Sequence, residues 1–176
     1  YHNTFAGGSA FSVIYYSTKY AEGDSFGMRR TVLLNNIFSF INRSTFTGYA
    51  KSWEAPADLF EVTDYNWIVI TKELVGKKLP LWLGENNILS RAVYRWKPET
   101  LFSILKDSPF REKGLDLSKK FTINDKEYGP LPGMLTGYFK GKNPDLGALQ
   151  YGEELNKWFL DELKEAGAFL EDSNSL

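Results

Sequence analysis

The sequence predicts a single α+β domain in which a mostly antiparallel sheet packs against two or three helices, the last of them long and amphipathic. The chain has 176 residues, a usual length for one domain, and 43% of them are hydrophobic and 16% aromatic, enough for a sizeable core. Segments with the two-residue period of strands and segments with helical spacing are interspersed without strict alternation, and their connections resemble hairpins rather than crossovers.

Short apolar or alternating segments predict the strands. Residues 9–20 alternate aromatic and β-branched side chains with others in a period of two, and residues 65–71 form an apolar run of strand length. A third segment contains Pro80, which favours an edge position because proline cannot donate to a sheet ladder. The expected strands cover residues 9–20, 65–71, 79–83, 91–96 and 134–140, with a hairpin over 121–128.

Three segments predict helices. Residues 28–43 place apolar side chains three and four positions apart, with a short strand over 31–34 as the alternative. Pro98 opens a second, short helix as a first-turn residue. The third pattern is the clearest, because Asp145 is placed to cap an amphipathic helix that runs to about residue 166.

Composition bounds the chemistry. The chain has no Cys and one His, His2, which excludes disulfides, thiolate zinc sites and Cys nucleophiles and argues against a Ser-His-Asp triad. No run approaches the ~20 apolar residues of a membrane-spanning helix, so we expect a soluble chain without a membrane span. The lack of Cys fits either redox compartment and leaves localisation undecided. We expect one domain over residues 1–176, with a frayed tail from about residue 170.

The net charge of −1 conceals a strong asymmetry. Residues 77–143 hold 13 Lys and Arg against 7 Asp and Glu, whereas residues 144–176 hold 2 against 8. Two interpretations stay open. In the first, the acidic last helix lies beside the basic region and neutralises it; in the second, the basic region forms a surface for an anionic partner.

The segment 91–97 is the first binding candidate. As a strand it places Tyr94 and Trp96 on one face and its cations on the other. Aromatics and cations together are typical of surfaces that bind single-stranded nucleic acid, and the alternative is core aromatics with solvated cations. A glycine-flanked loop over 137–142 could approach a phosphate, or be a hairpin turn with exposed lysines. The predicted binding residues are Arg91, Tyr94, Arg95, Trp96, Lys97, Lys140 and Lys142.

A carboxylate site is the catalytic alternative. Asp58 or Asp64, followed by a strand that ends in Lys72, supplies hard oxygen ligands for Mg²⁺ and a cation to stabilise charge. The pattern loosely resembles that of the restriction nucleases. It departs from them because Ile70 occupies the place of the second carboxylate, so Glu73 would have to substitute from the other strand face.

These observations favour a non-catalytic interaction module with an aromatic, partly basic surface. Its partner is expected to be another protein or a second copy of the chain, with nucleic acid or another polyanion as a further candidate, and no cofactor is required. High aromatic content favours this function because interface centres are enriched in Tyr, Trp and Phe, although one large core could also use them all. The alternative function is a metal-dependent phosphodiester hydrolase that uses Mg²⁺.

Overall fold

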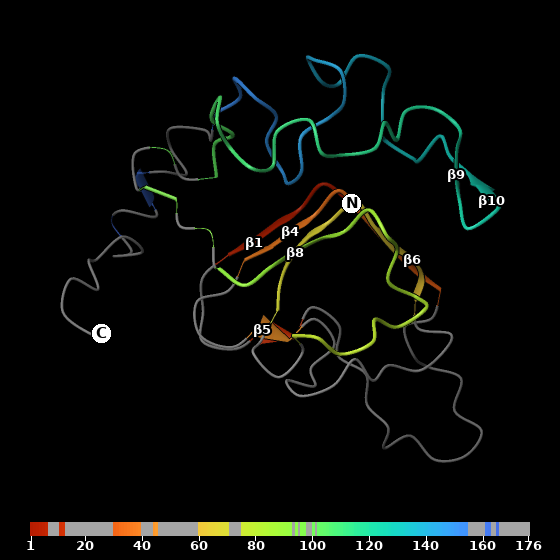
Figure 1. Ribbon diagram of the computed structural model, residues 1–176. Coiled ribbons are helices and arrows are strands. Elements are labelled where there is room, and N and C mark those ends of the chain that lie inside the picture. Colours follow the sequence, from red (N-terminus) through yellow and green to blue (C-terminus); the bar gives the residue numbers. More distant parts are fainter. Residues whose placement is uncertain are drawn as a thin grey trace.

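The computed structural model describes residues 1–6, 11–12, 30–39, 44–45, 60–70, 75–92, 94, 96–97, 100, 102–154, 161–162 and 165. Its elements in this part are ten short strands, joined by turns and loops (Figure 1). The described part of the chain contains no helix long and apolar enough to cross a membrane.

The largest sheet has four parallel strands, one from each of four successive passages of the chain. Phe38 is the neighbour of Phe5 on one side and of Ile68 on the other, so equivalent positions lie in one row. In spatial order the strands are β1 (Thr4–Ala6), β4 (Ile37–Ser39), β7 (Trp67–Val69) and β8 (Ile88–Ser90). Strands β1, β4 and β8 are seen side by side in Figure 1.

Two further parallel pairs belong to the same passages. An isolated parallel bridge joins Thr63, in one of these pairs, to Leu83 in the next passage of the chain. Equivalent strands therefore stack on one another as coils, which is the architecture of a parallel β-helix. The pairs are β3 (Thr31–Leu34) with β6 (Phe60–Asp64), and β2 (Phe11–Ser12) with β5 (Ser44–Thr45).

Alternate side chains of the stacked strands point into the coils and form an apolar stack. Phe38, Phe60, Ile68 and Leu83 are buried there, and the ring of Phe5 stacks on that of Phe38 with centroids 5.2 Å apart. Each coil buries these side chains only against its neighbours. The core therefore depends on the coils keeping their register.

Four asparagines, which we call the asparagine ladder, run along one corner of the coils: Asn3, Asn36, Asn66 and Asn87. At each step the backbone N–H and the side-chain amide of one asparagine both donate to Oδ1 of the next. The two distances are 3.0 and 3.1 Å from Asn3 to Asn36, 2.9 and 2.9 Å from Asn36 to Asn66, and 3.1 and 2.9 Å from Asn66 to Asn87. The ladder ties all four coils together through hydrogen bonds.

A left-handed residue precedes each of the first three ladder asparagines. The φ angles are 50° at His2, 58° at Asn35 and 53° at Tyr65. This conformation turns the chain at the corner, between β3 and β4 in one coil and between β6 and β7 in the next. It is costly for His and Tyr, so the hydrogen bonds of the ladder have to hold the corner in place.

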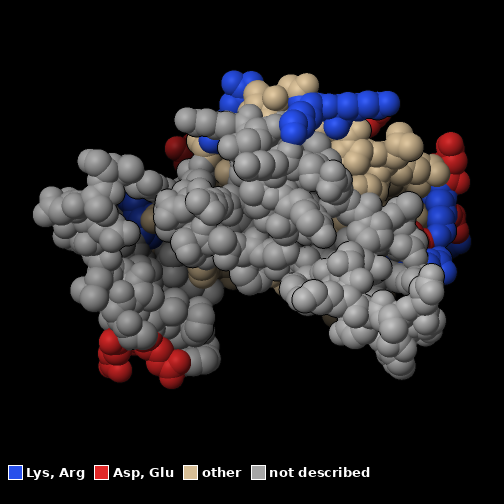
Figure 2. Space-filling view, turned by 90° about the horizontal axis from the view of Figure 1, so that it is seen from below, with Lys and Arg blue, Asp and Glu red and all other residues tan. Residues whose placement is uncertain are grey.

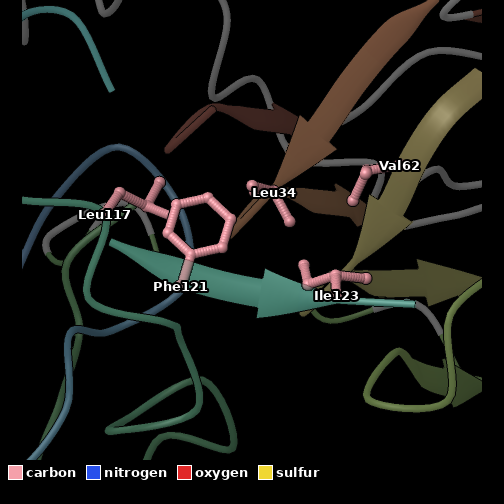
Figure 3. Close-up of a cluster of buried hydrophobic side chains, with 5 residues drawn as sticks. All are labelled: Leu34, Val62, Leu117, Phe121 and Ile123. Atoms are coloured by element: carbon pink, nitrogen blue, oxygen red, sulfur yellow. The ribbon is translucent and has the colours of Figure 1, made fainter. Parts of the chain in front are cut away.

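The segment from residue 102 to 154, which we call the C-terminal cover, packs against the outer faces of the coils. Its hairpin, β9 (Phe121–Ile123) and β10 (Lys126–Tyr128), turns at Asn124 and Asp125, whose φ angles are both positive as in a two-residue type I′ turn. Leu34 of β3 and Val62 of β6 meet Leu117, Phe121 and Ile123 of the cover in one buried cluster (Figure 3).

A second cluster joins the cover to the outer face of the largest sheet. Ile37 packs there against Ile104, Phe110 and Leu146, all buried. Gly147 follows at the corner, where its N–H donates to Asn35 O at 2.8 Å. A Cβ at this position would lie 2.6 Å from both Ile37 Cδ1 and Thr4 Oγ1, and φ is 92°, so only glycine fits.

The predicted antiparallel sheet is wrong for the coils, whose strands pair in parallel. The hairpin over 121–128 is confirmed as the antiparallel element. The apolar run 65–71 contains β7, but 79–83 has only the bridge at Leu83, and the described residues of 91–96 and 134–140 form bends, turns and loop.

The predicted helices are contradicted as well. Residues 31–34 are strand β3, which confirms the alternative stated for these residues, and residues 37–39 are strand β4. Their apolar side chains mimic helical spacing because both faces of β4 are buried, those of β3 are at least partly buried, and a two-residue corner separates the two strands. Of the described residues of the second expected helix, Thr100 has 3₁₀ conformation and residues 102–108 form turns and loop, without an α-helix.

The expected long C-terminal helix is not formed where it should begin. Residues 145–154 are turns and loop, and the carboxylate of Asp145 accepts from the backbone N–H of Glu112 and of Tyr151, both at 2.6 Å, instead of capping a helix. Beyond residue 154 the described residues are Asp161, Glu162 and Glu165, which have helical backbone. The proposed frayed tail lies outside the described residues.

Loss of one ladder amide should destabilise the whole stack. Asn66→Ala leaves the buried N–H groups of Asn36 without their Oδ1 acceptor and removes the amide donor to the carbonyl of Leu33, so we expect the free energy of unfolding to fall by roughly 3 kcal/mol or more. Urea denaturation measures this. Asn143→Ala, at an exposed amide with one 3.5 Å contact, is the control and should change stability by less than about 0.5 kcal/mol. Equal losses in the two variants would contradict the role of the ladder.

Candidate functional site

The aromatic residues of the predicted binding segment surround a buried phenylalanine. The ring centroid of Phe110 lies 4.6 Å from that of Tyr94, 5.7 Å from that of Trp96 and 4.9 Å from that of Trp67. Phe110 is buried completely, and Tyr94 and Trp96 are half-buried. The two predicted aromatics thus pack against the cover and expose only part of their rings.

The cations of the same prediction are exposed. Arg91 and Lys97 precede and follow the half-buried aromatics along the chain, and Lys140 and Lys142 lie in the loop of the cover. Within the described part of the chain none of the four forms an ion pair with a carboxylate. Arg95 lies outside the described residues.

The cations of the hairpin region, in contrast, are neutralised locally. Glu61 lies at the bulge between β3 and β6 and pairs with Arg30 at 3.0 Å and with Lys126. Hydrogen bonds from Lys126 and Arg30 hold the pKa of Glu61 below its ordinary value. Lys120 pairs with Glu127 at 2.8 Å. In Figure 2 basic side chains gather along one margin, and acidic and basic side chains stand together at another.

The carboxylate proposed as a metal ligand is occupied by hydrogen bonds. Asp64 is 2% exposed, and its oxygens accept from the backbone and side chain of Asn86, both at 2.8 Å, and from the N–H of Tyr65 at 3.0 Å. A Cβ on Gly84 would lie 2.3 Å from its Cγ, so the backbone closes over the group. Asp64 thus holds the corner before β8, and no group of three or more potential metal ligands occurs among the described residues.

The other residues of the catalytic alternative, Asp58, Lys72 and Glu73, lie outside the described residues. The described residues therefore do not test whether these side chains lie near Asp64. They also leave the Mg²⁺ prediction untested.

A polar node that the sequence analysis did not anticipate joins the first coil to the cover. Asn35 Nδ2 lies 3.0 Å from His2 Nε2 and donates to Leu115 O at 2.7 Å, while Asn35 Oδ1 accepts from Leu115 N at 2.8 Å. The hydroxyl of Tyr138 is 3.2 Å from the same His2 nitrogen. Burial raises the pKa of Tyr138 to about 12, so its hydroxyl keeps its proton at neutral pH.

The hydrogen bonds assign the state of the histidine. An amide nitrogen can only donate, so Nε2 of His2 is the acceptor and the ring proton is on Nδ1. Burial lowers the pKa of His2 from 6.5 to about 4, opposed in part by the backbone of Gly147. The node therefore contains a neutral imidazole over the physiological range.

The ladder and this node are the features that sequence reasoning missed. A signal was present, since an asparagine stands directly before an apolar residue of β4, β7 and β8, in Asn36-Ile37, Asn66-Trp67 and Asn87-Ile88. The unequal spacing of these pairs along the chain hid the repeat.

Fold and site together define a segment of parallel β-helix whose outer faces are closed by its own C-terminal cover. No family model, curated protein or solved structure matches the chain.

Removal of the central ring should loosen the cover. We expect Phe110→Ala to lower the free energy of unfolding by about 3–5 kcal/mol, because it empties a completely buried site lined by Trp67, Tyr94 and Trp96. Urea denaturation followed by tryptophan fluorescence measures both the loss and the changed environment of the indoles. The control is Phe139→Ala in a half-buried ring, and a loss as large there would show that the Phe110 cluster has no special weight.

Protonation of His2 should destabilise the fold in acid. The folded pKa of about 4 lies below the ordinary 6.5, so the unfolded state binds the proton first and stability falls as pH drops from about 6.5 to 4. The full difference is roughly 3 kcal/mol. Chemical denaturation across this range measures it, with His2→Gln as the control that removes the titration. An identical pH profile in the two proteins would contradict the assignment.

Proposed function

We propose that this chain is a non-catalytic interaction module that binds an anionic macromolecular partner through exposed cations at the edge of its aromatic cluster and in the loop of its cover. The observation that carries the proposal is the contrast between two sets of cations. Those of the hairpin region pair with Glu61, Glu127 or Asp116, whereas Arg91, Lys97, Lys140 and Lys142 have no described carboxylate partner.

The acidic part of the chain supports the same proposal. Glu153 and Glu154 are exposed and form no ion pair with a described cation. Self-neutralisation of the basic middle by the acidic third is therefore not observed in the described part. Unpaired surface cations attract polyanions and acidic surfaces at long range, which favours encounter with such a partner.

Two exposed apolar side chains stand near lysines along the chain. Leu81 is 95% exposed in the loop that contains Lys78, and Leu135 is 75% exposed ahead of Lys140. Contacts to such leucines could add affinity after electrostatic encounter. The half-buried Tyr94 and Trp96 contribute their accessible edges rather than open faces for stacking.

A salt series tests the proposal. With labelled oligothymidylate as a uniform polyanion, we expect affinity to fall as the salt concentration rises. The double variant Arg91→Gln, Lys97→Gln should reduce the slope of the logarithm of the binding constant against the logarithm of the salt concentration by about 1.4, because each lost contact with a single strand removes about 0.7. Fluorescence anisotropy measures both. Lys140→Gln with Lys142→Gln tests the loop in the same way.

The matched control is the double variant Lys119→Gln, Lys120→Gln, whose cations pair with Asp116 and Glu127. It removes the same charge and should keep a slope near that of the unaltered chain. Light scattering at several protein concentrations reports self-association. A monomer without salt-sensitive binding would end the proposal.

A further inference from the structure

We propose that copies of this chain associate end to end, with β8 of one copy pairing in parallel with β1 of the next. The two surfaces involved, which we call the stacking ends, are Asn87 with β8 at one end of the coils and Asn3 with β1 at the other. They go beyond the proposed function because they use hydrogen bonds and apolar contacts instead of cations. The asparagine ladder, the edge backbones and the apolar row inside the coils carry the proposal.

The largest sheet has two edges. β1 and β8 each pair with one neighbour, and among the described strands none pairs with their other side. Three strand spacings, about 14 Å in all, separate the two edges, so one copy cannot join them to each other. An unpaired edge is a template for another strand, and a stack of coils continues where its end meets an equivalent end.

The asparagine ladder has an open acceptor at one end. Asn3 gives its backbone N–H and its amide to Asn36, and no described donor reaches its own Oδ1. Every other Oδ1 of the ladder receives a backbone N–H and an amide from the preceding asparagine. Asn3 is exposed, so the same pair of donors from another copy would complete it.

The other end of the ladder offers these donors. Asn87 repeats the position of Asn66, because the amide of each donates to two carbonyl oxygens beside the corner. The carbonyls belong to Leu33 and Asp64 for Asn66, at 3.0 and 2.9 Å, and to Thr63 and Gly84 for Asn87, at 2.7 and 2.8 Å. Asn66 also donates to Asn87, whereas Asn87 has no described asparagine ahead of it. Asn3 of the next copy takes this place.

The backbone groups of the two edges match in the same register. At each step the residue after a ladder asparagine donates its N–H to the carbonyl of the previous asparagine, at 2.7 to 2.9 Å, and Asn87 O accepts from no described donor. Successive residues of a strand direct their N–H and C=O groups to opposite sides, so those of Thr4 point away from β4 and those of Leu89 away from β7. In the stack, Thr4 N–H of the next copy meets Asn87 O, and Leu89 N–H meets the carbonyl of that Thr4.

The apolar row inside the coils is closed in the middle and open at its ends. Phe5, Phe38, Ile68 and Leu89 are register neighbours in that order. Phe38 and Ile68 are each 1% exposed, whereas Phe5 and Leu89 are only partly buried. Stacking places Leu89 of one copy against Phe5 of the next and buries both, which adds a hydrophobic contribution to the hydrogen bonds.

This match between the two ends assigns the occupant to a second copy. The donors that Asn3 lacks are those that Asn87 leaves unused, and the apolar rows continue each other in the same register. Two different surfaces meet in the contact, so the association is head to tail and does not close on itself. The expected product is a series of oligomers whose length grows with protein concentration.

Proline variants at the two ends test the pairing. Thr4→Pro removes the outward N–H of β1 and Leu89→Pro that of β8, whereas Thr4→Val and Leu89→Val keep these groups. Both Thr4 variants lose the 3.0 Å bond from Ala148 N to Thr4 Oγ1, so that loss cancels. We expect association of each proline variant to be at least about tenfold weaker than that of its valine control. Sedimentation velocity over a range of protein concentrations measures this.

A mixture of the two proline variants tests the direction of the contact. Thr4→Pro keeps an intact β8 and Leu89→Pro keeps an intact β1, so the mixture should form a 1:1 dimer and no longer oligomer. This dimer also shows that both variants fold. Undiminished self-association of Leu89→Pro alone would indicate pairing of two β1 edges, and of Thr4→Pro alone pairing of two β8 edges. Either result would overturn the proposal.

Amide hydrogen exchange tests the same contact without a substitution. The N–H groups of Thr4 and Leu89 should exchange more slowly as protein concentration rises, because each becomes hydrogen-bonded in the stack. The N–H of Lys140, in the exposed loop of the cover, is the control and should not change. A chain that stays monomeric at every concentration, with unchanged exchange at Thr4 and Leu89, would overturn the proposal and leave a different polypeptide as the candidate for these edges.

The two proposed interactions can fail separately. Stacking should persist at about 1 M salt, where charges are screened beyond ~3 Å, and in the Lys140→Gln, Lys142→Gln variant. Polyanion binding should be lost under the first condition and weakened in the variant. Self-association that disappears at high salt would assign the contact to cations and overturn the stacking ends, while the proposed function would stand.

Discussion

The asparagine ladder is the interaction on which the rest of the structure depends. Asn36 and Asn66 are completely buried, and a buried amide is tolerated only when its donors and acceptor are satisfied. The ladder satisfies them only in one register. A slip of one residue would break both bonds of a step and turn Phe38 and Ile68 away from the core, so one polar row sets the orientation of the apolar row beside it.

The same strands are apolar on their outer faces, which explains why the coils need a cover. Ile37 and Trp67 would be open to water without Phe110 and Leu146. The cover has little regular structure of its own and is held by specific contacts, among them those of Asn35 at the corner of the ladder. The rings of Trp67, Tyr94 and Trp96 are used in this closure.

Local patterns predicted those parts of the fold that depend on local contacts. The hairpin over 121–128 was predicted because its turn residues suit positive φ, and β7 because its apolar run is short. At the site, exposure of the lysines in 137–142 followed from their charge. The half-buried state of Tyr94 could not be predicted, since it depends on Phe110, which the chain brings back from a distant position.

The sequence by itself determined a core-forming, cysteine-free chain, the two-residue alternation of its strands, the tight hairpin and the uneven charge. Tertiary structure alone decided that the strands stack in parallel, and it selected the strand over 31–34 instead of the helix over 28–43. The physical reason lies in long-range pairing. Hydrogen bonds between Asn3, Asn36, Asn66 and Asn87 join residues that are far apart and unequally spaced, so no local period reveals them.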